Sequence, residues 1–378
     1  MSSGNQKMDS LDLLDGIDDS VYGRVSPKEE LCHDFKPWHK PRKHWIRLNQ
    51  WNRHIGELLS SNETSLINYF SLPGKDAIDI RTIGRCLPVG KKLCFYGLEC
   101  KENAFNQSIT DSLLRDYDYI SGKSKIEPRT HFEDLGNEKS KLTMEIVSRD
   151  PFHIINLDFT DSIFSPTHGE DTIKALLQLL TIQFDRQYCD WFLFITTRCN
   201  KESIDLDLVK KCVLSSLAQN YKKEEFRKEI NQQIYQIDKE TYLQDEELLT
   251  DTQFEKIVII SLLKIILENA VKHHIEMEAK TIYSYSVDEG NEQPDMLSVA
   301  LKFKKHITFD DASKIIEHKE TPNINEVALG KRIIACVSHS KNVDRLLNED
   351  VATKEDMIQQ TKELLKICGY DITRYPYD

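Results

Sequence analysis

The segment His153–Phe164, HIINLDFTDSIF, decides the fold that the sequence predicts. The apolar residues within Ile154–Leu157 form a short run that is typical of a strand in a covered parallel sheet. Asp158 and Phe159 follow at the point where this strand is expected to end. Ligands of open α/β sheets bind outside the carboxyl ends of the strands. An acid and an aromatic ring at this end are suited to accept hydrogen bonds from an amine and to stack on a ring.

Strand-like and helix-like segments alternate on both sides of this strand. Segments in this order form βαβ units with parallel strands and right-handed crossovers. Later in the chain, two apolar stretches flank the turn-rich DEGNEQPD, which predicts an antiparallel hairpin. We therefore predict an α/β fold with a doubly wound, mostly parallel sheet that ends in this hairpin and carries helical additions. The predicted strands are Leu66–Leu72, Lys92–Glu99, a weaker one around Thr130–Leu135, Phe152–Phe159, Asp190–Thr196, Thr281–Val287 and Met296–Phe303.

Composition excludes several classes of protein. A net charge of -12 over 378 residues argues against a globally basic nucleic-acid binder, although a local basic patch is compatible with it. The nine cysteines are odd in number and form no CxxC pair, which favours reduced thiols and predicts no metal site. The first residues lack a signal-peptide pattern, and the apolar run Ile257–Leu267 is too short to cross a bilayer. We expect a soluble, cytoplasmic protein with no membrane partner.

The net charge of the N-terminal part changes from negative to positive along the sequence. Residues 1–35 are acidic and are expected to be a disordered leader, or a short helix that folds onto a partner. Residues 36–54 hold six Lys/Arg, three Trp and no acid. Basic residues interleaved with aromatic ones suit nucleic-acid contact through phosphates and base stacking. Alternatively, this is an entry segment whose tryptophans dock on the domain while its basic side chains stay solvated. The candidate nucleic-acid-binding residues are Lys40, Arg42, Lys43, Arg47 and Trp45.

The order of these elements resembles the class I S-adenosylmethionine-dependent methyltransferase fold, a Rossmann-like sheet whose last two strands form an antiparallel hairpin. The resemblance covers residues 61–305. Within it, INLDF followed by TDS is similar to the IDLDPFGS segment of the tRNA guanine-N2 dimethyltransferase family. The chain also resembles, more loosely, degenerate bacterial relatives associated with antiviral defence. It departs from the family pattern in having no proline after Asp158 and an acid, Asp161, where the family has glycine.

The resemblance implies S-adenosylmethionine as cofactor and assigns roles to several residues. Pro73 and Gly74 take the place of the glycine-rich cofactor loop, or are an ordinary turn. Glu99, at the end of the second strand, accepts hydrogen bonds from the cofactor ribose, or is a solvated strand end.

Two further sets of roles follow. Asp134 faces the adenine amine, or is a plain surface acid. Asn156, Asp158 and Phe159 are the catalytic candidates that hold the target amine, or they form a structural strand terminus.

Two functions follow from these observations. The first is a methyltransferase-like protein that acts on an amine of a nucleic acid. The alternative is a catalytically inactive scaffold or binding subunit of a multi-protein complex, in antiviral defence, with a protein partner on the helical additions. The sequence leaves the oligomeric state open. The predicted parts are a leader at 1–35, a basic Trp-rich segment at 36–60, the methyltransferase-like domain at 61–305 with a helical insertion at about 206–280, and a helical extension at 306–378.

Overall fold

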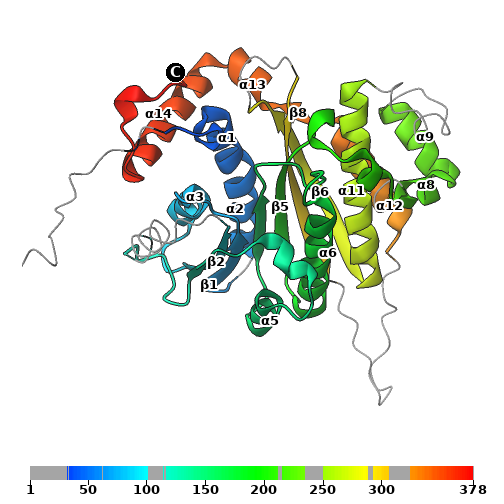
Figure 1. The fold of residues 1–378 in the computed structure, drawn as a ribbon, viewed down its shortest axis with the longest axis horizontal. Helices are drawn as coiled ribbons and strands as arrows, with labels where there is room; N and C mark the ends of the chain where they lie inside the picture. The colour runs from blue at the N-terminus through cyan, green and yellow to red at the C-terminus, as the bar shows by residue number, and fades with distance from the viewer. Residues whose placement is uncertain are drawn as a thin grey trace, which may run out of the picture.

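A computed structural model of the protein describes residues 32, 34–61, 63–100, 114, 116–211, 215–234, 250–287, 293–305 and 324–377. Within them, one eight-stranded sheet has the order β3-β2-β1-β4-β5-β7-β6-β8. Neighbours among β1 to β5 pair in parallel, whereas β7 runs antiparallel to both β5 and β6 (Figure 1). The strands are β1 Leu66–Ser71, β2 Lys92–Glu99, β3 Lys125–Pro128, β4 Ile154–Asp158, β5 Trp191–Arg198, β6 Ile275–Tyr285, β7 Met296–Lys305 and β8 Lys341–Asn342.

Helices cover both faces of this sheet, as the predicted fold class requires. We call first face the one covered by α1 to α3, η2, α13 and α14, and second face the one covered by α5, α6, α11 and α12. The doubly wound, mostly parallel sheet with its antiparallel hairpin, β6 and β7, is thereby confirmed, and β8 adds a short strand beside β6. The helices are α1 Pro41–Ile46, the π-helical η2 Arg47–Asn52, α2 Arg53–Ser61, α3 Ile78–Cys86, α5 Lys141–Ser148, α6 Gly169–Arg186, α7 Leu206–Val209, α8 Ser215–Tyr221, α9 Glu224–Gln233, α11 Asp251–Lys272, α12 Glu326–Ser338, α13 Val343–Glu349 and α14 Val351–Ile367.

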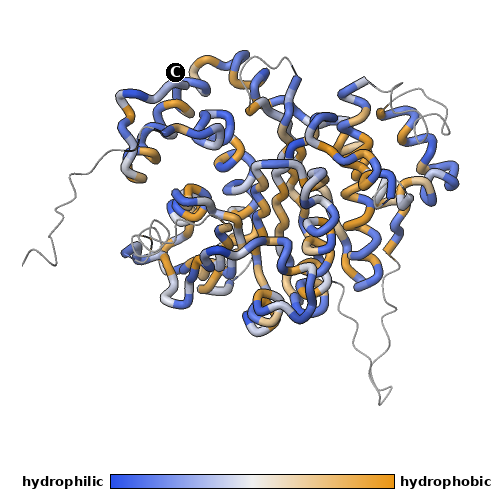
Figure 2. Tube along the Cα trace, viewed as in Figure 1, coloured by the Kyte–Doolittle hydropathy of each residue, from blue (hydrophilic) through white to orange (hydrophobic). Residues whose placement is uncertain are grey.

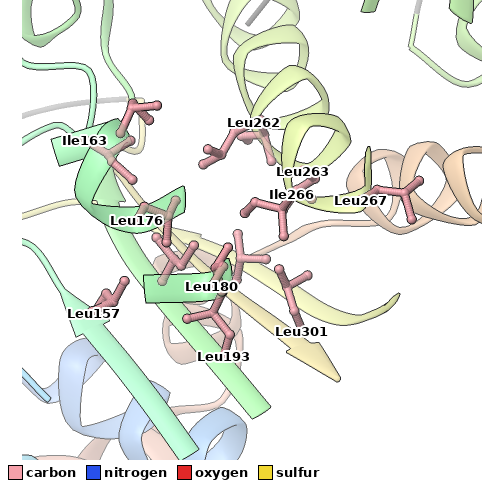
Figure 3. Packing of buried hydrophobic residues seen from close by; sticks show 14 of the residues in the cluster. Leu157, Ile163, Leu176, Leu180, Leu193, Leu262, Leu263, Ile266, Leu267 and Leu301 are labelled. Carbon is pink, nitrogen blue, oxygen red and sulfur yellow. The ribbon is translucent and has the colours of Figure 1, made fainter. Parts of the chain in front are cut away.

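The core follows the alternation of side chains along each strand. On β4, Ile154 points into the cluster of the first face, whereas Ile155 and Leu157 point into that of the second. Hydrophobic positions gather on the strands and on α11, and hydrophilic ones along the outer helices (Figure 2). On the second face, Leu157 and Leu176 pack toward the apolar side chains of α11, which include Leu263 (Figure 3).

The apolar run Ile257–Leu267 lies within the long helix α11. Thr250 is the N-cap of this helix, which begins at Asp251, and its side chain accepts a hydrogen bond from the Gln253 amide. Its apolar residues are buried between α6, α8, α12 and β6. In the described part of the chain, every helix falls short of the length and apolar character that a membrane crossing needs.

The predicted third strand is wrong. β3 lies earlier, at Lys125–Pro128, and pairs in parallel with the end of β2. The predicted stretch instead forms η3, a 3-10 helix at Phe132–Gly136. Phe132 and Leu135 are both buried and lie three residues apart, which is helical rather than strand spacing. The sequence pattern also predicts a helix from about Asn103 to Asp116, but this stretch lies largely outside the described residues, as does most of the leader.

A close approach at the start of α6 makes Gly169 necessary. A Cβ on Gly169 would lie 2.6 Å from Leu208 Cδ2 and 2.7 Å from the carbonyl carbon of Phe164. Since backbone cannot move aside as a flexible side chain can, we expect Gly169→Ala to lower the free energy of unfolding by about 1 to 3 kcal/mol. Gly56→Ala, where nothing lies within 4 Å, should instead raise it by about 0.5 to 1 kcal/mol. Urea unfolding of both variants checks this; equal effects would contradict it.

Candidate functional site

The chain reverses direction across the sheet between β1 and β4. From β1 the next strands run outward to β2 and β3, and from β4 they run the other way to β5. In doubly wound sheets, ligands bind at this switch point, beyond the carboxyl ends of the strands. Asp158 is the last residue of β4 and Ser71 the last of β1, so both lie at this point. The strand within His153–Phe164 therefore ends where a ligand crevice is expected.

The carboxylate of Asp158 holds the ammonium group of Lys43, a residue of α1. Lys43 Nζ donates to Asp158 Oδ1 at 2.6 Å, to Tyr285 Oη at 3.2 Å and to Thr196 Oγ1 at 3.4 Å. It also lies 4.7 Å from the centre of the Trp51 ring. Only 3% of the Lys43 side chain is exposed, against 21% for Asp158. Burial lowers the pKa of Lys43 to about 8, although the charge of Asp158 opposes this shift.

Behind this pair lies a second polar group at the ends of β1 and β4. Tyr69 Oη donates to Asp79 Oδ2 at 2.6 Å, and Asn156 Nδ2 donates to Tyr69 Oη at 3.0 Å. Burial raises the pKa of Asp79. Asn156 Oδ1 and Asp79 Oδ1 are buried and lack a hydrogen-bond partner among the described residues. Two unmatched buried acceptors near the carboxyl ends of these strands are a place where a bound donor would be stabilised.

The turn after β1 is covered by the two ends of the described chain. Gly74 has φ +61°, which favours glycine, and the side chain of Asp76 follows it. Asp76 Oδ2 accepts from His39 Nε2 at 3.2 Å and from Tyr370 Oη at 3.0 Å. His39 is neutral in this arrangement, because its Nδ1 accepts from the Lys36 amide and burial lowers its pKa.

The other predicted cofactor residues lie at separate places. Pro73 packs against β2, where a Cβ on Gly97 would lie 2.9 Å from Pro73 Cγ. Glu99 ends β2 and is buried, at the same edge of the sheet as Asp158. Asp134 is exposed and accepts from the His131 amide at 3.4 Å, which caps η3. The contacts of Asp134 are thus those of a local helix cap.

The predicted catalytic residues do not all face one space. Asn156 and Asp158 share the first face of the sheet with Lys43. Phe159 turns to the second face, where its ring meets that of Phe132 edge-on at 5.5 Å. The structure therefore brings together Asn156 and Asp158, whereas Phe159 belongs to the opposite core.

The basic Trp-rich segment is folded into the molecule. Lys40, Lys43 and Arg47 are buried, so the expectation that they stay solvated is wrong. The physical reason is that each cation finds an acceptor inside the molecule. Lys43 Nζ donates to Asp158 and Lys40 Nζ to the Val287 carbonyl, both at the end of the sheet, whereas Arg47 Nη2 donates to the carbonyl of Trp38 in its own segment at 3.1 Å. Trp51 is buried in the core of the first face, as a docked tryptophan would be.

Two further candidate residues of this segment lie at its edge. Arg42 Nη1 donates to the Ser286 carbonyl at 2.5 Å and pairs with Asp344 at 2.8 Å. The Trp45 ring meets Tyr283 edge-on at 4.9 Å. Both side chains are half-buried.

Sequence reasoning missed Thr196, Tyr285 and Asp79. Thr196 lies on β5 opposite Asp158 in the parallel register, so the end of the predicted strand Asp190–Thr196 was a usable signal. Tyr285 ends β6, beside the turn of the predicted hairpin. Asp79 had no such signal, because an acid in the first turn of a helix is common. Within the described residues, no group of three or more His, Cys, Asp or Glu is placed to hold a metal ion.

Residues 32–377 match the model of the family described as PP_RS20740-like. The chain belongs to this family. No curated protein matches it. The match takes in the basic Trp-rich segment, the sheet and the C-terminal helices together, so these parts belong to one family architecture.

Solved structures of methyltransferases resemble the chain weakly. A candidate rRNA methylase from Clostridium thermocellum is 8% identical, with a TM-score of 0.34, over 68% of this chain and 96% of that one. A candidate class I S-adenosylmethionine-dependent methyltransferase from Listeria monocytogenes is 10% identical, with a TM-score of 0.33, over 77% and 70%. An rRNA methylase from Streptococcus thermophilus is 12% identical, with a TM-score of 0.32, over 67% and 97%. Scores at this level carry no argument, and the fold rests on the strand order.

Proposed function

We propose that this chain is a methyltransferase-like protein that binds S-adenosylmethionine at the carboxyl ends of β1, β2 and β4 and acts on an amine. The observation that carries the proposal is the placement of Glu99 and Asp158. They end the strands on either side of β1, at the switch point of the sheet. Carboxylates at these two places suit a ribose on one side and an amine on the other.

The unmatched acceptors support the same proposal. Asn156 Oδ1 on β4 and Asp79 Oδ1 on α3 are buried without a partner among the described residues, so a bound amino group would be stabilised there. S-adenosylmethionine supplies an activated methyl group when bound, so the protein's part is largely to position the reacting groups. In that arrangement Glu99 binds the ribose, Asn156 orients the amine, and Asp158 accepts hydrogen bonds from the amine.

Calorimetry on the purified chain tests cofactor binding. We expect S-adenosylmethionine or its demethylated product to bind, and Glu99→Ala to weaken the affinity by at least about tenfold, since it removes hydrogen bonds to a ligand. Glu138→Ala, an exposed acid beyond η3, is the matched control and should bind as the wild type does. Binding that survives Glu99→Ala unchanged would contradict the assigned site.

A second candidate function is a non-catalytic subunit of a multi-protein complex, for which antiviral defence is the setting that the resemblance implies. The observation that favours it is the closure of the site by the chain itself. Lys43 pairs with Asp158, and His39 and Tyr370 bind Asp76. If calorimetry detects no binding of S-adenosylmethionine at a concentration on the order of millimolar, this candidate is favoured over the first.

Contact with a nucleic acid, the role that the sequence predicts for the basic segment, is tested at Arg42, whose side chain keeps 30% of its surface exposed. If Arg42 neutralises a phosphate, Arg42→Gln should reduce the slope of log affinity against log salt by about one. Binding of RNA and DNA oligonucleotides over a range of salt measures this slope. A slope equal to that of the wild type would mean that Arg42 serves the Asp344 contact and not a phosphate.

A further inference from the structure

The surroundings of Lys43 Nζ match a primary ammonium group in number and kind. Three oxygen acceptors from three strands lie around it: Asp158 Oδ1 on β4, Thr196 Oγ1 on β5 and Tyr285 Oη on β6. A primary ammonium carries three N–H donors and no acceptor, so each donor has a partner. We call these three residues, with Trp51, the ammonium cradle.

Two aromatic rings complete the cradle. Lys43 Nζ lies 4.7 Å from the centre of the Trp51 ring and 5.6 Å from that of Tyr285. Rings at such distances attract a cation through their quadrupole. The cradle therefore offers one negative charge, two neutral acceptors and two ring faces.

This chemistry discriminates between classes of amine. A sulfonium or a quaternary ammonium has no N–H group and would leave Asp158 Oδ1 and Tyr285 Oη without an N–H donor, whereas Thr196 Oγ1 keeps its contact with Ser298 Oγ at 3.3 Å. The exocyclic amine of a nucleic-acid base is neutral and has two donors, so it would neutralise no part of the Asp158 charge. A primary alkylammonium satisfies both the charge and all three acceptors.

The two partners of the ion pair differ in their access to solvent. Lys43 enters from α1 with 3% of its side chain exposed, whereas Asp158 keeps 21%. The carboxylate can thus be reached from outside while Lys43 holds it from within. Because Thr196, Tyr285 and Trp51 are buried, Asp158 is the member of the cradle that an incoming amine contacts first.

We infer that the cradle is a binding site for a primary alkylammonium group and that Lys43 occupies it in place of a substrate. This inference rests on the proposed function, because it names the class of amine on which that function acts: a primary alkyl amine such as a lysine side chain or a polyamine. α1 is then an internal pseudosubstrate segment. An incoming amine binds Asp158 after Lys43 withdraws.

Chemical rescue tests the inference. Lys43→Ala removes the atoms of n-propylamine, so n-propylammonium should fill the vacated cradle and raise the Tm of the variant in a saturable way. Tetramethylammonium has the positive charge but no N–H donors. We expect the same Tm shift only at a concentration at least about tenfold higher than that of n-propylammonium. Wild-type protein, whose cradle Lys43 already fills, is the matched control and should need an n-propylammonium concentration at least about tenfold higher for the same shift, because the added amine must displace Lys43. Equal shifts with both cations, or none with either, would overturn the inference.

A refolding experiment covers the case in which the Lys43→Ala variant is unstable. If Lys43→Ala does not fold when purified alone, refolding is carried out with n-propylammonium, with tetramethylammonium and with neither. Recovery of folded protein with n-propylammonium alone supports the site, and equal recovery in all three overturns it. The rescue needs no S-adenosylmethionine, so its failure is distinct from a failure of cofactor binding by the wild type.

Discussion

Replacing Asp158 with asparagine lowers the free energy of unfolding by about 3 to 5 kcal/mol, because it leaves a buried cation without its counter-charge. Lys43 has 3% of its side chain exposed, and Arg47 is buried on the next turn of the same helical segment. The amide that replaces the carboxylate still offers an oxygen, but it cannot offset two positive charges held out of water. Urea unfolding at neutral pH measures the loss.

The reverse substitution should be milder. Lys43→Met fills the space with an apolar chain, and Asp158, with 21% of its side chain exposed, can regain water, so we expect a loss of about 1 kcal/mol. The double variant should be more stable than Asp158→Asn alone, since it removes the stranded charge. Asp161→Asn, at an exposed acid three residues on, is the control and should change little. Equal losses from the two single variants would contradict a buried, uncompensated Lys43.

The pH dependence of this pair gives a second readout. The pKa of Lys43 is lowered from 10.5 to about 8 by burial, so between these values the unfolded chain binds more protons than the folded one. Stability attributable to Lys43 therefore rises with pH across this interval. The stability of the wild type relative to Lys43→Met should increase from pH ~8 to ~10. A constant difference would mean that Lys43 titrates alike in both states.

The fold was predictable where the local pattern and the final structure agree. The apolar run before Asp158 became the buried strand β4, and Glu99 ends β2 at the predicted residue. In both cases a mostly apolar stretch ends at a carboxylate, which is the pattern of a covered parallel strand. The prediction of the third strand was wrong because Phe132 and Leu135, the two buried apolar residues of η3, have the three-residue spacing of a helix and not the alternation of a strand.

The site was only partly predictable, because its decisive contact spans 115 positions of the chain. Lys43 stands in a basic segment, where a solvated or nucleic-acid-binding role is the ordinary interpretation. Nothing local to the segment indicates that a carboxylate, a hydroxyl and a phenol from three strands lie at the end of the sheet. The polar strand ends and the basic segment could each be predicted from the sequence. The contact between Lys43 and Asp158 could not, because it depends on the tertiary fold.

The second large effect concerns Lys264, the charge inside the apolar helix α11. Its side chain is 1% exposed, and its Nζ donates to Glu268 Oε1 at 2.7 Å and also to Glu326 on α12. Asn220 of α8 donates to the same Glu326 oxygen at 3.2 Å. The buried ammonium thus links α11 to α12, and Glu326 in turn links α12 to α8; the three helices lie at one end of the molecule (Figure 1).

Because two carboxylates share this ammonium, removing one should cost far less than removing both. We expect Glu268→Gln and Glu326→Gln each to lower the free energy of unfolding by about 1 kcal/mol. The double variant should lose about 3 to 5 kcal/mol, well beyond the sum, since Lys264 then has no counter-charge. Glu170→Gln, in the exposed ion pair with Lys174, is the matched control and should leave stability unchanged within error. Additive losses would show that Lys264 finds water or another acceptor, and that the three helices do not depend on this charge.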